Sequence, residues 1–335
     1  MTATANALEA MIADLPGPDR VAAEAVSTRA GSVLRPSGAL ARLDRVAAWL
    51  AGWQRTDRPR VDHPWVVVFA ADHGVAGAGV SAYPADVTKA MLGAFDAGVA
   101  TAPAMARALG ARFTAVDVGV GAPTGDIRSE PALDPARFEA CVVAGRAATR
   151  AAADDGTDLL VFGEMGIGNT TAAAAVCAAI FGGPAADWVG RGTGVDDRGL
   201  ARKVAAVEAA RTHAAGLGWA EILRTAGGSE LVAISAAIAE ARLRSIPVVL
   251  DGFVVGASAA PLHSGRPDAL DHCIAGHRSA EVGHGPLLER LGLEPLIELE
   301  LRLGEASGAL VALTIVRLAA VAVCDVATFD EWGLA

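Results

Sequence analysis

The part of this sequence best suited to chemistry is a glycine-rich stretch, residues 163–171, that reads Gly-Glu-Met-Gly-Ile-Gly-Asn-Thr-Thr. It follows an apolar run, 158–162, that predicts a buried strand, and it precedes an alanine-rich run, 172–180, that predicts a buried helix. A glycine-rich loop between a strand and a helix binds phosphate, because backbone N–H groups point at the anion and the helix dipole favours it. The phosphate ligands that this predicts are Gly166, Gly168, Asn169 and Thr170.

The same stretch also matches the start of the P-loop pattern, with Gly163, four further residues, Gly168 and then Thr170. Position 169 is Asn, however, where that pattern requires the Lys that handles a triphosphate. Asp251 ends another apolar run and would suit the Mg²⁺-associated Asp of a nucleotide-hydrolysing enzyme. A P-loop-like nucleotide kinase or ATPase is therefore an alternative interpretation.

A second glycine run, residues 190–194, extends the predicted anion site. Asp196 follows it and would cap the next helix, on which Lys203 lies between one and two turns from the start. Lysine is scarce, since only Lys89 and Lys203 occur among 28 basic residues. A lysine on this helix could fold back to the same phosphate as a point charge, and Ser279 is a further candidate ligand.

Glu305 is the candidate general base. It lies between glycines and follows the apolar residues Leu301 and Leu303, and burial beside apolar side chains raises the pKa of a carboxyl toward neutrality. Glu164 has a similar place beside the first loop. Two carboxylates could share the work, one taking a proton and the other stabilising positive charge on a sugar. The competing interpretation of Glu305 is an acid that stabilises a helix dipole.

These residues need a sheet to bring them together. Six runs predict strands, at residues 65–70, 112–118, 158–162, 246–251, 273–276 and 296–303. Helical patterns are predicted at residues 3–15, 21–30, 39–53, 85–109, 135–154, 172–180, 198–215, 230–244 and 309–324. Strands that alternate with helices indicate an α/β fold with an open, mostly parallel sheet and helices on both faces. The loops after the strands would meet at one edge.

Composition excludes several classes of protein. A formal net charge of −10 without a basic block argues against a nucleic-acid partner. There is no signal-peptide pattern, and the longest apolar run, 309–323, is broken by Arg317 and is too short to span a bilayer. We therefore expect a cytoplasmic protein that does not insert in a membrane.

Neither the cysteines nor the histidines predict a metal site. The 4 cysteines lie far apart in or beside apolar runs, so we expect small buried residues rather than ligands or disulfides. Four of the 7 histidines fall within residues 263–284, but no pair has the i, i+4 spacing of a metal site on a helix.

Five short motifs occur in order along the chain. They are residues 71–75 (Ala-Asp-His-Gly-Val) with Tyr83-Pro84, residues 163–171, residues 192–194 (Gly-Thr-Gly), residues 276–281 (Gly-His-Arg-Ser-Ala-Glu) and residues 301–308 (Leu-Arg-Leu-Gly-Glu-Ala-Ser-Gly). Together they resemble the nicotinate-nucleotide:dimethylbenzimidazole phosphoribosyltransferase family. Any one motif is weak, but five in this order are specific, and the resemblance runs from about residue 20 to the C-terminus.

The resemblance implies transfer of phosphoribose from nicotinate mononucleotide to 5,6-dimethylbenzimidazole. The products would be α-ribazole 5′-phosphate and nicotinate, in the synthesis of the lower-ligand nucleotide of cobalamin. It also implies a homodimer that needs no metal and no cofactor. The implied domains are an N-terminal helical part of a small domain (1–55), an α/β phosphoribosyltransferase domain (56–308) and a C-terminal helix associated with the small domain (309–335).

The motifs also carry over residue roles. Glu305 would be the general base, accepting the N–H proton of the benzimidazole while the other ring nitrogen attacks C1′, and Glu164 matches the family's second acidic position. The implied ligands are Gly166, Gly192, Lys203 and Ser279 for the 5′-phosphate, and Ser81, Tyr83, Met91 and Leu303 for the base. Many relatives carry a glutamine after the Tyr-Pro pair, whereas residues 85–91 here read Ala-Asp-Val-Thr-Lys-Ala-Met. The preferred base, whether benzimidazole, adenine or a phenol, therefore stays open.

Overall fold

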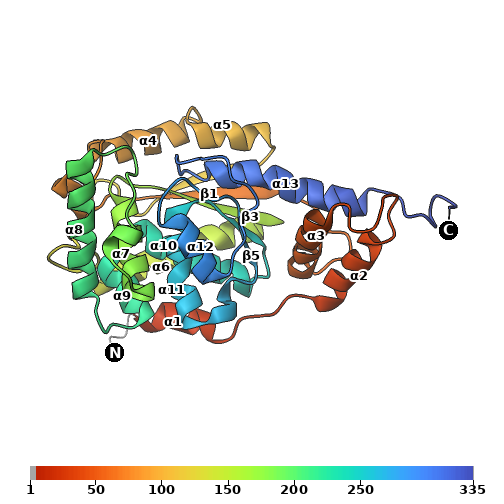
Figure 1. Ribbon diagram of the computed structural model, residues 1–335, viewed down its shortest axis with the longest axis horizontal. Helices are drawn as coiled ribbons and strands as arrows, with labels where there is room; N and C mark the ends of the chain where they lie inside the picture. Colours follow the sequence, from red (N-terminus) through yellow and green to blue (C-terminus); the bar gives the residue numbers. More distant parts are fainter. Residues whose placement is uncertain (1–4, 335) are drawn as a thin grey trace.

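A parallel β-sheet lies at the centre of the computed structural model, which describes residues 5–334 (Figure 1). In these residues the sheet has five strands in the order β2-β1-β3-β4-β5, and every neighbouring pair is parallel. The strands are β1 (Pro64–Ala70), β2 (Arg112–Asp117), β3 (Leu159–Met165), β4 (Val248–Leu250) and β5 (Cys273–Ala275). The predicted α/β fold with a parallel sheet is confirmed.

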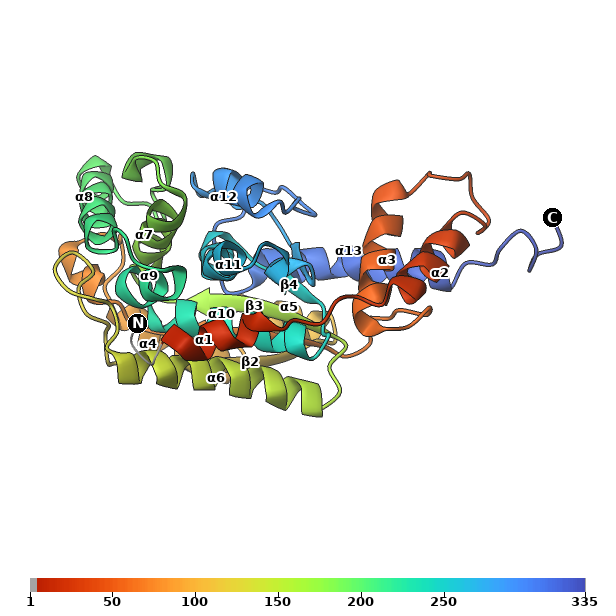
Figure 2. The same ribbon diagram turned by 90° about the horizontal axis from the view of Figure 1, so that it is seen from below.

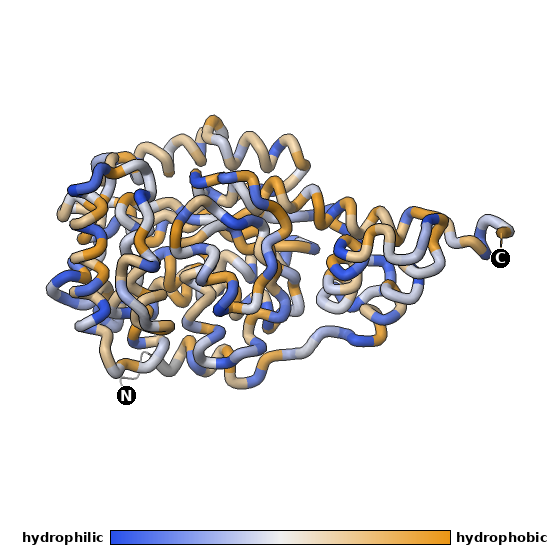
Figure 3. Tube along the Cα trace, viewed as in Figure 1, coloured by the Kyte–Doolittle hydropathy of each residue, from blue (hydrophilic) through white to orange (hydrophobic). Residues whose placement is uncertain are grey.

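The α-helices surround this sheet. They are α1 (Ala5–Ala13), α2 (Arg20–Ala30), α3 (Ala41–Gln54), α4 (Asp86–Asp96), α5 (Thr101–Ala108), α6 (Pro135–Asp154), α7 (Asn169–Phe181), α8 (Asp197–His213), α9 (Trp219–Ala226), α10 (Ser229–Leu243), α11 (Phe253–Gly265), α12 (His284–Leu291) and α13 (Ser307–Cys324). Hydrophobic and hydrophilic residues are mixed along the trace (Figure 3), and α10 and α11 are buried along almost their whole length, as expected of helices at the centre of a core.

Two predicted elements differ from the structure. The single helix expected over 85–109 is two helices, because the chain turns at Gly98, whose φ of 69° lies in the left-handed region. The strand expected over 296–303 is a loop beside β5, joined to it in the described residues by one parallel bridge between Ile297 and His277. Left-handed backbone at Glu300 (φ 56°) interrupts the extended conformation that its alternating pattern predicts.

Alternate residues of the central strands point to two separate cores, as the pleat requires. In β1, Val67 and Phe69 pack with residues of α6, α7, α10 and α11, whereas Val66 and Val68 pack with residues of α3, α5 and α13. Figure 2 shows helices on both sides of the strands. The prediction of helices on both faces is therefore confirmed.

The terminal helices lie in two places. α2, α3 and the C-terminal half of α13 gather at one end of the molecule, beyond the sheet (Figures 1 and 2). α1 lies apart from them, and its apolar residues Leu8, Met11 and Ile12 join the core that contains α10. The guanidinium of Arg242 in α10 lies 4.2 Å from the ring centroid of Trp53 in α3, which ties the terminal helices to the α/β body.

By length and composition alone, α13 could cross a membrane: its 18 residues have a mean hydropathy of 2.1. However, 61% of that stretch is buried inside the protein. Leu310, Leu313 and Val316 belong to the core on one face of the sheet. α13 is therefore packed as a core helix.

The sheet brings distant segments to one edge. Because the strands are parallel, the residues after their carboxyl ends lie close together, which is where open α/β sheets bind ligands. At this edge His73 follows β1, Gly166 follows β3, Asp251 follows β4 and Gly276 follows β5.

Candidate active site

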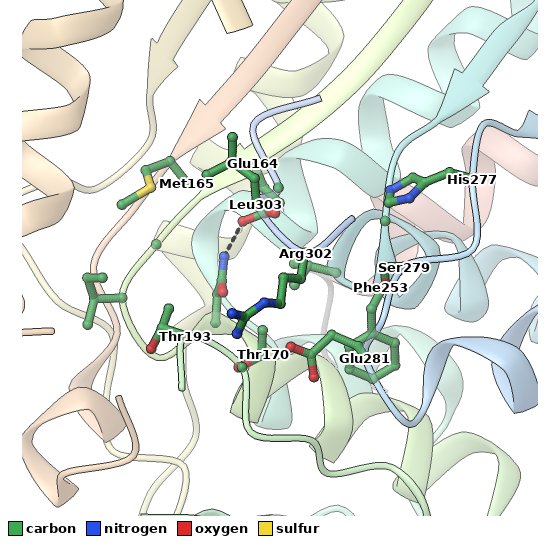
Figure 4. A pocket seen from close by; sticks show the side chains of 17 residues that line it. Glu164, Met165, Thr170, Thr193, Phe253, His277, Ser279, Glu281, Arg302 and Leu303 are labelled. Atoms are coloured by element: carbon green, nitrogen blue, oxygen red, sulfur yellow. Dashed lines mark hydrogen bonds between the residues drawn. The ribbon is translucent and has the colours of Figure 1, made fainter. Parts of the chain in front are cut away.

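A cavity lies at this carboxyl edge, between the end of β3, the start of α7 and the segment before α13 (Figure 4). It is lined by Glu164, Met165, Gly166, Ile167, Asn169, Thr170, Gly192, Thr193, Gly252, Phe253, Val254, His277, Ser279, Glu281, Arg302, Leu303 and Gly304. Segments more than a hundred residues apart in sequence therefore form one pocket.

The glycine-rich loop has the geometry of an anion site. A Cβ at Gly166 would lie 2.7 Å from the carbonyl oxygen of Ala71, so only glycine fits there. Gly168 precedes α7 in the left-handed region (φ 96°), and in the described residues no side chain caps this helix. The loop is also fixed from outside, because the backbone N–H of Ile167 donates a 3.2 Å hydrogen bond to Oγ1 of Thr88. A fixed, uncapped helix N-terminus favours a bound anion.

A buried histidine–glutamate contact lies next to the loop. His73 Nε2 lies 2.5 Å from Oε1 of Glu230, and both side chains are fully buried. The same Glu230 oxygen would lie 3.0 Å from a Cβ at Gly166. The His73–Glu230 pair therefore packs directly against the glycine-rich loop at Gly166.

Lys203 joins the two glycine runs. Its Nζ donates a 2.9 Å hydrogen bond to Oγ1 of Thr170, and a Cβ at Gly192 would lie 3.0 Å from the same nitrogen. Only 1% of Lys203 is exposed, and this burial lowers its pKa while the carboxylate of Glu281 raises it. The structure thus brings the two runs and the lysine together, although Lys203 lies behind Thr170 rather than in the cavity wall.

Sequence reasoning did not assign Glu281 and Arg302 to the site. Both line the cavity, and Figure 4 shows their side chains directed toward the same region as Thr170. Burial raises the pKa of Glu281, whereas the charges of Lys203 and Arg302 lower it. Both residues lie within the motifs described above. Glu281 was not expected at the site, because a carboxylate repels a bound anion.

Glu164 lies at the end of β3 and lines the cavity. Nδ2 of Asn169 donates a hydrogen bond to its Oε2 (Figure 4). Burial, followed by repulsion from the charge of Asp251, raises the pKa of Glu164 from 4.5 to about 8, against the lowering effect of Asn169. Asn169 occupies the sequence position where a P-loop has its lysine, and it binds the carboxyl group of Glu164 instead of a phosphate-binding cation being present there.

Glu305 follows Gly304 on a left-handed turn, with φ of 60° at Glu305 and 69° at Ala306. Such a backbone costs a non-glycine residue about 1–2 kcal/mol. Its side chain is 4% exposed, and Oε2 has no hydrogen-bond partner in the described residues. Burial raises its pKa, a backbone N–H of Ala102 lowers it, and the charge of Asp251 raises it. Glu305 therefore does not line the cavity itself, but it directly follows Gly304, which does, and one of its carboxylate oxygens is buried without a partner in the described residues.

Most of the ligands expected for the phosphate line the cavity, whereas only one of those expected for the base does. Of those expected for phosphate, the cavity wall contains Gly166, Asn169, Thr170, Gly192 and Ser279. Of those expected for the base, Leu303 lines the cavity, and Ser81 Oγ lies 3.3 Å from Oγ1 of Thr193 in the wall. Neither Tyr83 nor Met91 lines the cavity. Tyr83 is 56% exposed, and Met91, a residue of α4, packs against the core on one face of the sheet.

Phe253 and His277 are among the further wall residues that sequence reasoning missed. Phe253 begins α11 directly after β4 and Gly252, and nothing in its local sequence sets it apart. His277 lies in a recognised motif but has no ligand spacing. Its ring lies against Gly308, where a side chain would collide with it. Only the fold shows that these residues reach the cavity.

Asp251, the acid that suggested a Mg²⁺ site, does not line the cavity. Its Oδ1 accepts a 2.9 Å hydrogen bond from the backbone N–H of Ala309 and lies 3.5 Å from Nε2 of His277. The carboxylate therefore bonds to the start of α13. Among residues 5–334, no group of three or more His, Cys, Asp or Glu could hold a metal ion.

The chain is similar to known proteins over almost its whole length. A family model described as phosphoribosyltransferase matches residues 15–334. A nicotinate-nucleotide–dimethylbenzimidazole phosphoribosyltransferase from Mesorhizobium japonicum is 50% identical over 331 residues, which are 98% of this chain and 97% of the relative. The enzyme of the same name from Cereibacter sphaeroides is 47% identical over 323 residues, 96% of this chain and 94% of the relative.

Solved structures agree with these relatives. The crystal structure of CobT from Thermus thermophilus has a TM-score of 0.90 and 41% identity, and the match covers 94% of this chain and 99% of that one. A second structure from the same organism, under the phosphoribosyltransferase name, has a TM-score of 0.89 and 39% identity, with 95% and 99% covered. The chain therefore belongs to the nicotinate-nucleotide–dimethylbenzimidazole phosphoribosyltransferase family.

Proposed function

We propose that this chain transfers phosphoribose from nicotinate mononucleotide to 5,6-dimethylbenzimidazole or a related base. The products are nicotinate and α-ribazole 5′-phosphate, in the synthesis of the cobalamin lower ligand. The names of the full-length relatives support this reaction. The observation that carries it is a buried carboxylate, Glu305, with an unpartnered oxygen directly behind a cavity that has an anion site at its other end.

The anion site holds the 5′-phosphate of the mononucleotide. The uncapped start of α7 offers backbone N–H groups to the phosphate. Lys203 adds a positive charge close by, since its Nζ donates a hydrogen bond to Oγ1 of Thr170 at the start of this helix. Gly192, which lies beside Thr170, and Ser279 complete the lining of the site. Fixing the phosphate leaves C1′ of the ribose free to face Glu305, and such positioning contributes much of an enzyme's rate acceleration.

The chemical step forms one bond and breaks another. A ring nitrogen of the benzimidazole attacks C1′ as the bond from C1′ to the nicotinate nitrogen breaks, and Glu305 accepts the proton of the other ring nitrogen. Nicotinate departs from a pyridinium and takes the bonding electron pair, so it needs no acid. Attack from the opposite face converts the β-nucleotide into an α-product. Glu164, with a pKa of about 8, is mainly protonated at neutral pH and acts toward the sugar as a hydrogen-bond donor.

The base enters between the segment before α13 and the loop after β1. Leu303 and Ser81 border this side, and we assign Tyr83 and Met91 to its outer part. Benzimidazole, adenine and a phenol offered together at equal concentration would show which base the pocket prefers.

We further propose a cytoplasmic homodimer with a small helical domain built from residues 1–55 and 309–335 around the α/β domain of residues 56–308. The exposed apolar side chains of Leu318 and Trp332, at 55% and 67%, lie in the second of these segments and support an interface there. Light scattering after size-exclusion chromatography would give the mass, and a monomer at micromolar concentration would contradict the dimer.

The reaction is tested by incubating the purified protein with nicotinate mononucleotide and dimethylbenzimidazole and separating the products by chromatography. Nicotinate and a ribotide should appear in equal amounts and only when the base is present. No release of nicotinate would overturn the proposal. A parallel incubation with ATP tests the kinase or ATPase alternative, which the family membership and the Asn169–Glu164 contact do not favour.

A further inference from the structure

One buried acid near the cavity has no part in the reaction as described above. Asp251 ends β4, is 1% exposed and does not line the cavity. A buried carboxylate is costly unless it is hydrogen-bonded or paired, so its contacts should show why it is there.

Its contacts lead to the turn that carries Glu305. α13 begins without a side-chain cap of its own in the described residues, because its N-cap residue is Ala306. The backbone N–H of Ala309 donates to Asp251 Oδ1 at 2.9 Å. Burial raises the pKa of Asp251, and the charge of His277 and the backbone N–H groups of Ala309, Gly308 and Ala306 oppose that rise. An acid from a neighbouring strand thus caps this helix.

The cap matters because the turn is strained. Three consecutive residues are left-handed, with φ of 81° at Gly304, 60° at Glu305 and 69° at Ala306. Non-glycine residues keep such a backbone only when their surroundings hold it. Two contacts fix this turn: the backbone N–H of Glu305 bonds to the carbonyl oxygen of Glu164 at 3.2 Å, and Asp251 holds the residues that follow.

We propose that Asp251 is a positioning residue, whose buried carboxylate holds the left-handed turn and so fixes where the carboxylate of Glu305 points. This inference rests on the proposed function, since it concerns the base of that reaction. Asp251 does not line the cavity, so its effect on the position of the base passes through Glu305, while its charge also raises the pKa of Glu164.

The charges around Glu305 give a readout that a purely structural residue would not change. The groups that face it are Glu164 from β3, Asp251 after β4 and a backbone N–H of Ala102 from α5. His277 faces Asp251, and Glu230 faces Glu164. The charge of Asp251 raises the pKa of Glu305, so its removal lowers that pKa. The acid limb of the pH–kcat profile then moves to lower pH.

Two variants separate charge from position. D251N keeps an oxygen acceptor for Ala309 but removes the charge, whereas D251E keeps the charge and moves it by one methylene. We expect both to lower kcat by roughly 10- to 100-fold, the cost of misplacing a reacting group by about 1 Å. KM for nicotinate mononucleotide should stay unchanged, and only D251N should shift the acid limb to lower pH.

The matched control is D158N. Asp158 is a half-buried acid before β3, at the opposite edge of the sheet, and it accepts backbone hydrogen bonds from Asp62 (2.5 Å) and His63 (2.8 Å). D158N should keep the kcat and pH profile of the unmodified protein. It reports the effect of losing a comparable acid away from the site.

The outcomes are distinguishable. If the unmodified protein releases no nicotinate, the proposed function fails and the inference with it. If the unmodified protein is active and D251N and D251E match it in kcat, only the inference is overturned. It is also overturned if both variants fail to fold while D158N folds, because Asp251 is then a residue of general stability. A lower kcat with unchanged KM and a shifted limb in D251N alone supports it.

Discussion

The backbone N–H of Glu305 donates a 3.2 Å hydrogen bond to the carbonyl oxygen of Glu164. This contact joins the end of β3, which leads into the anion site, to the turn that carries the proposed base. The two acids lie 141 positions apart in sequence (305 − 164), yet this bond joins them directly, although only Glu164 lines the cavity. The turn that carries the proposed base is therefore held against the strand that leads into the proposed phosphate site.

Lys203→Ala should raise KM for nicotinate mononucleotide by roughly 10- to 100-fold, the value of a lost charge-assisted hydrogen bond. The reason is that its ammonium lies at the junction of the two glycine runs. Steady-state kinetics measure the effect. Lys89→Ala, at the chain's other lysine, which is exposed on α4, is the control and should change nothing. An unchanged KM in Lys203→Ala would remove this lysine from the phosphate site.

Gly166→Ala should both destabilise the protein, by about 1–3 kcal/mol, and weaken mononucleotide binding. The added Cβ would lie 2.7 Å from the carbonyl oxygen of Ala71 and would push the loop out of place. Gly77→Ala is the matched control, since a Cβ there meets nothing within 4 Å. Denaturant unfolding and calorimetric titration give the two quantities, and equal behaviour of the two variants would show that the loop tolerates a side chain.

The free energy of unfolding should fall as pH rises from about 4.5 to about 8, because folding raises the pKa of Glu164 from 4.5 to about 8. In this window the unfolded chain loses the proton of Glu164 while the folded protein keeps it. Stability from this group is therefore complete below pH 4.5 and is lost as pH approaches 8, with a slope of at most about 1.4 kcal/mol per pH unit.

Glu164→Gln removes that proton from both states. Its unfolding free energy, measured by urea denaturation across the same range, should depend less on pH than that of the unmodified protein. Identical slopes for the two proteins would mean that Glu164 titrates normally in the folded state.

Local patterns in the sequence predicted most elements that form the site. The apolar runs before residues 71, 163 and 251 are strands, and α6 begins and ends where its pattern predicts. α11 was not predicted because it contains Gly256 and Pro261, which usually interrupt helices. Its burial against α7 and α10 outweighs these preferences.

The site was harder to predict than the fold. The proposed anion ligands were suggested by local chemistry, because a glycine-rich loop before a helix and a lysine nearby suit an anion. Glu281 and Phe253 have ordinary local sequences, and only tertiary packing brings them to the cavity. Asp251 shows most clearly what local sequence cannot predict. Its position after a strand suggested a metal ligand, but its carboxylate accepts a hydrogen bond from Ala309, at the start of a helix 58 residues later in the sequence.

The most direct test of the central claim is the turnover of Glu305→Gln. Loss of the proton acceptor should lower kcat for nicotinate release by roughly 10²–10⁴-fold, the usual contribution of a general base, with little change in KM for the mononucleotide. Glu300→Gln removes an exposed acid from the segment leading to the same turn and should keep full activity. Near-normal kcat in Glu305→Gln would contradict the account, because Glu305 would then not be the base.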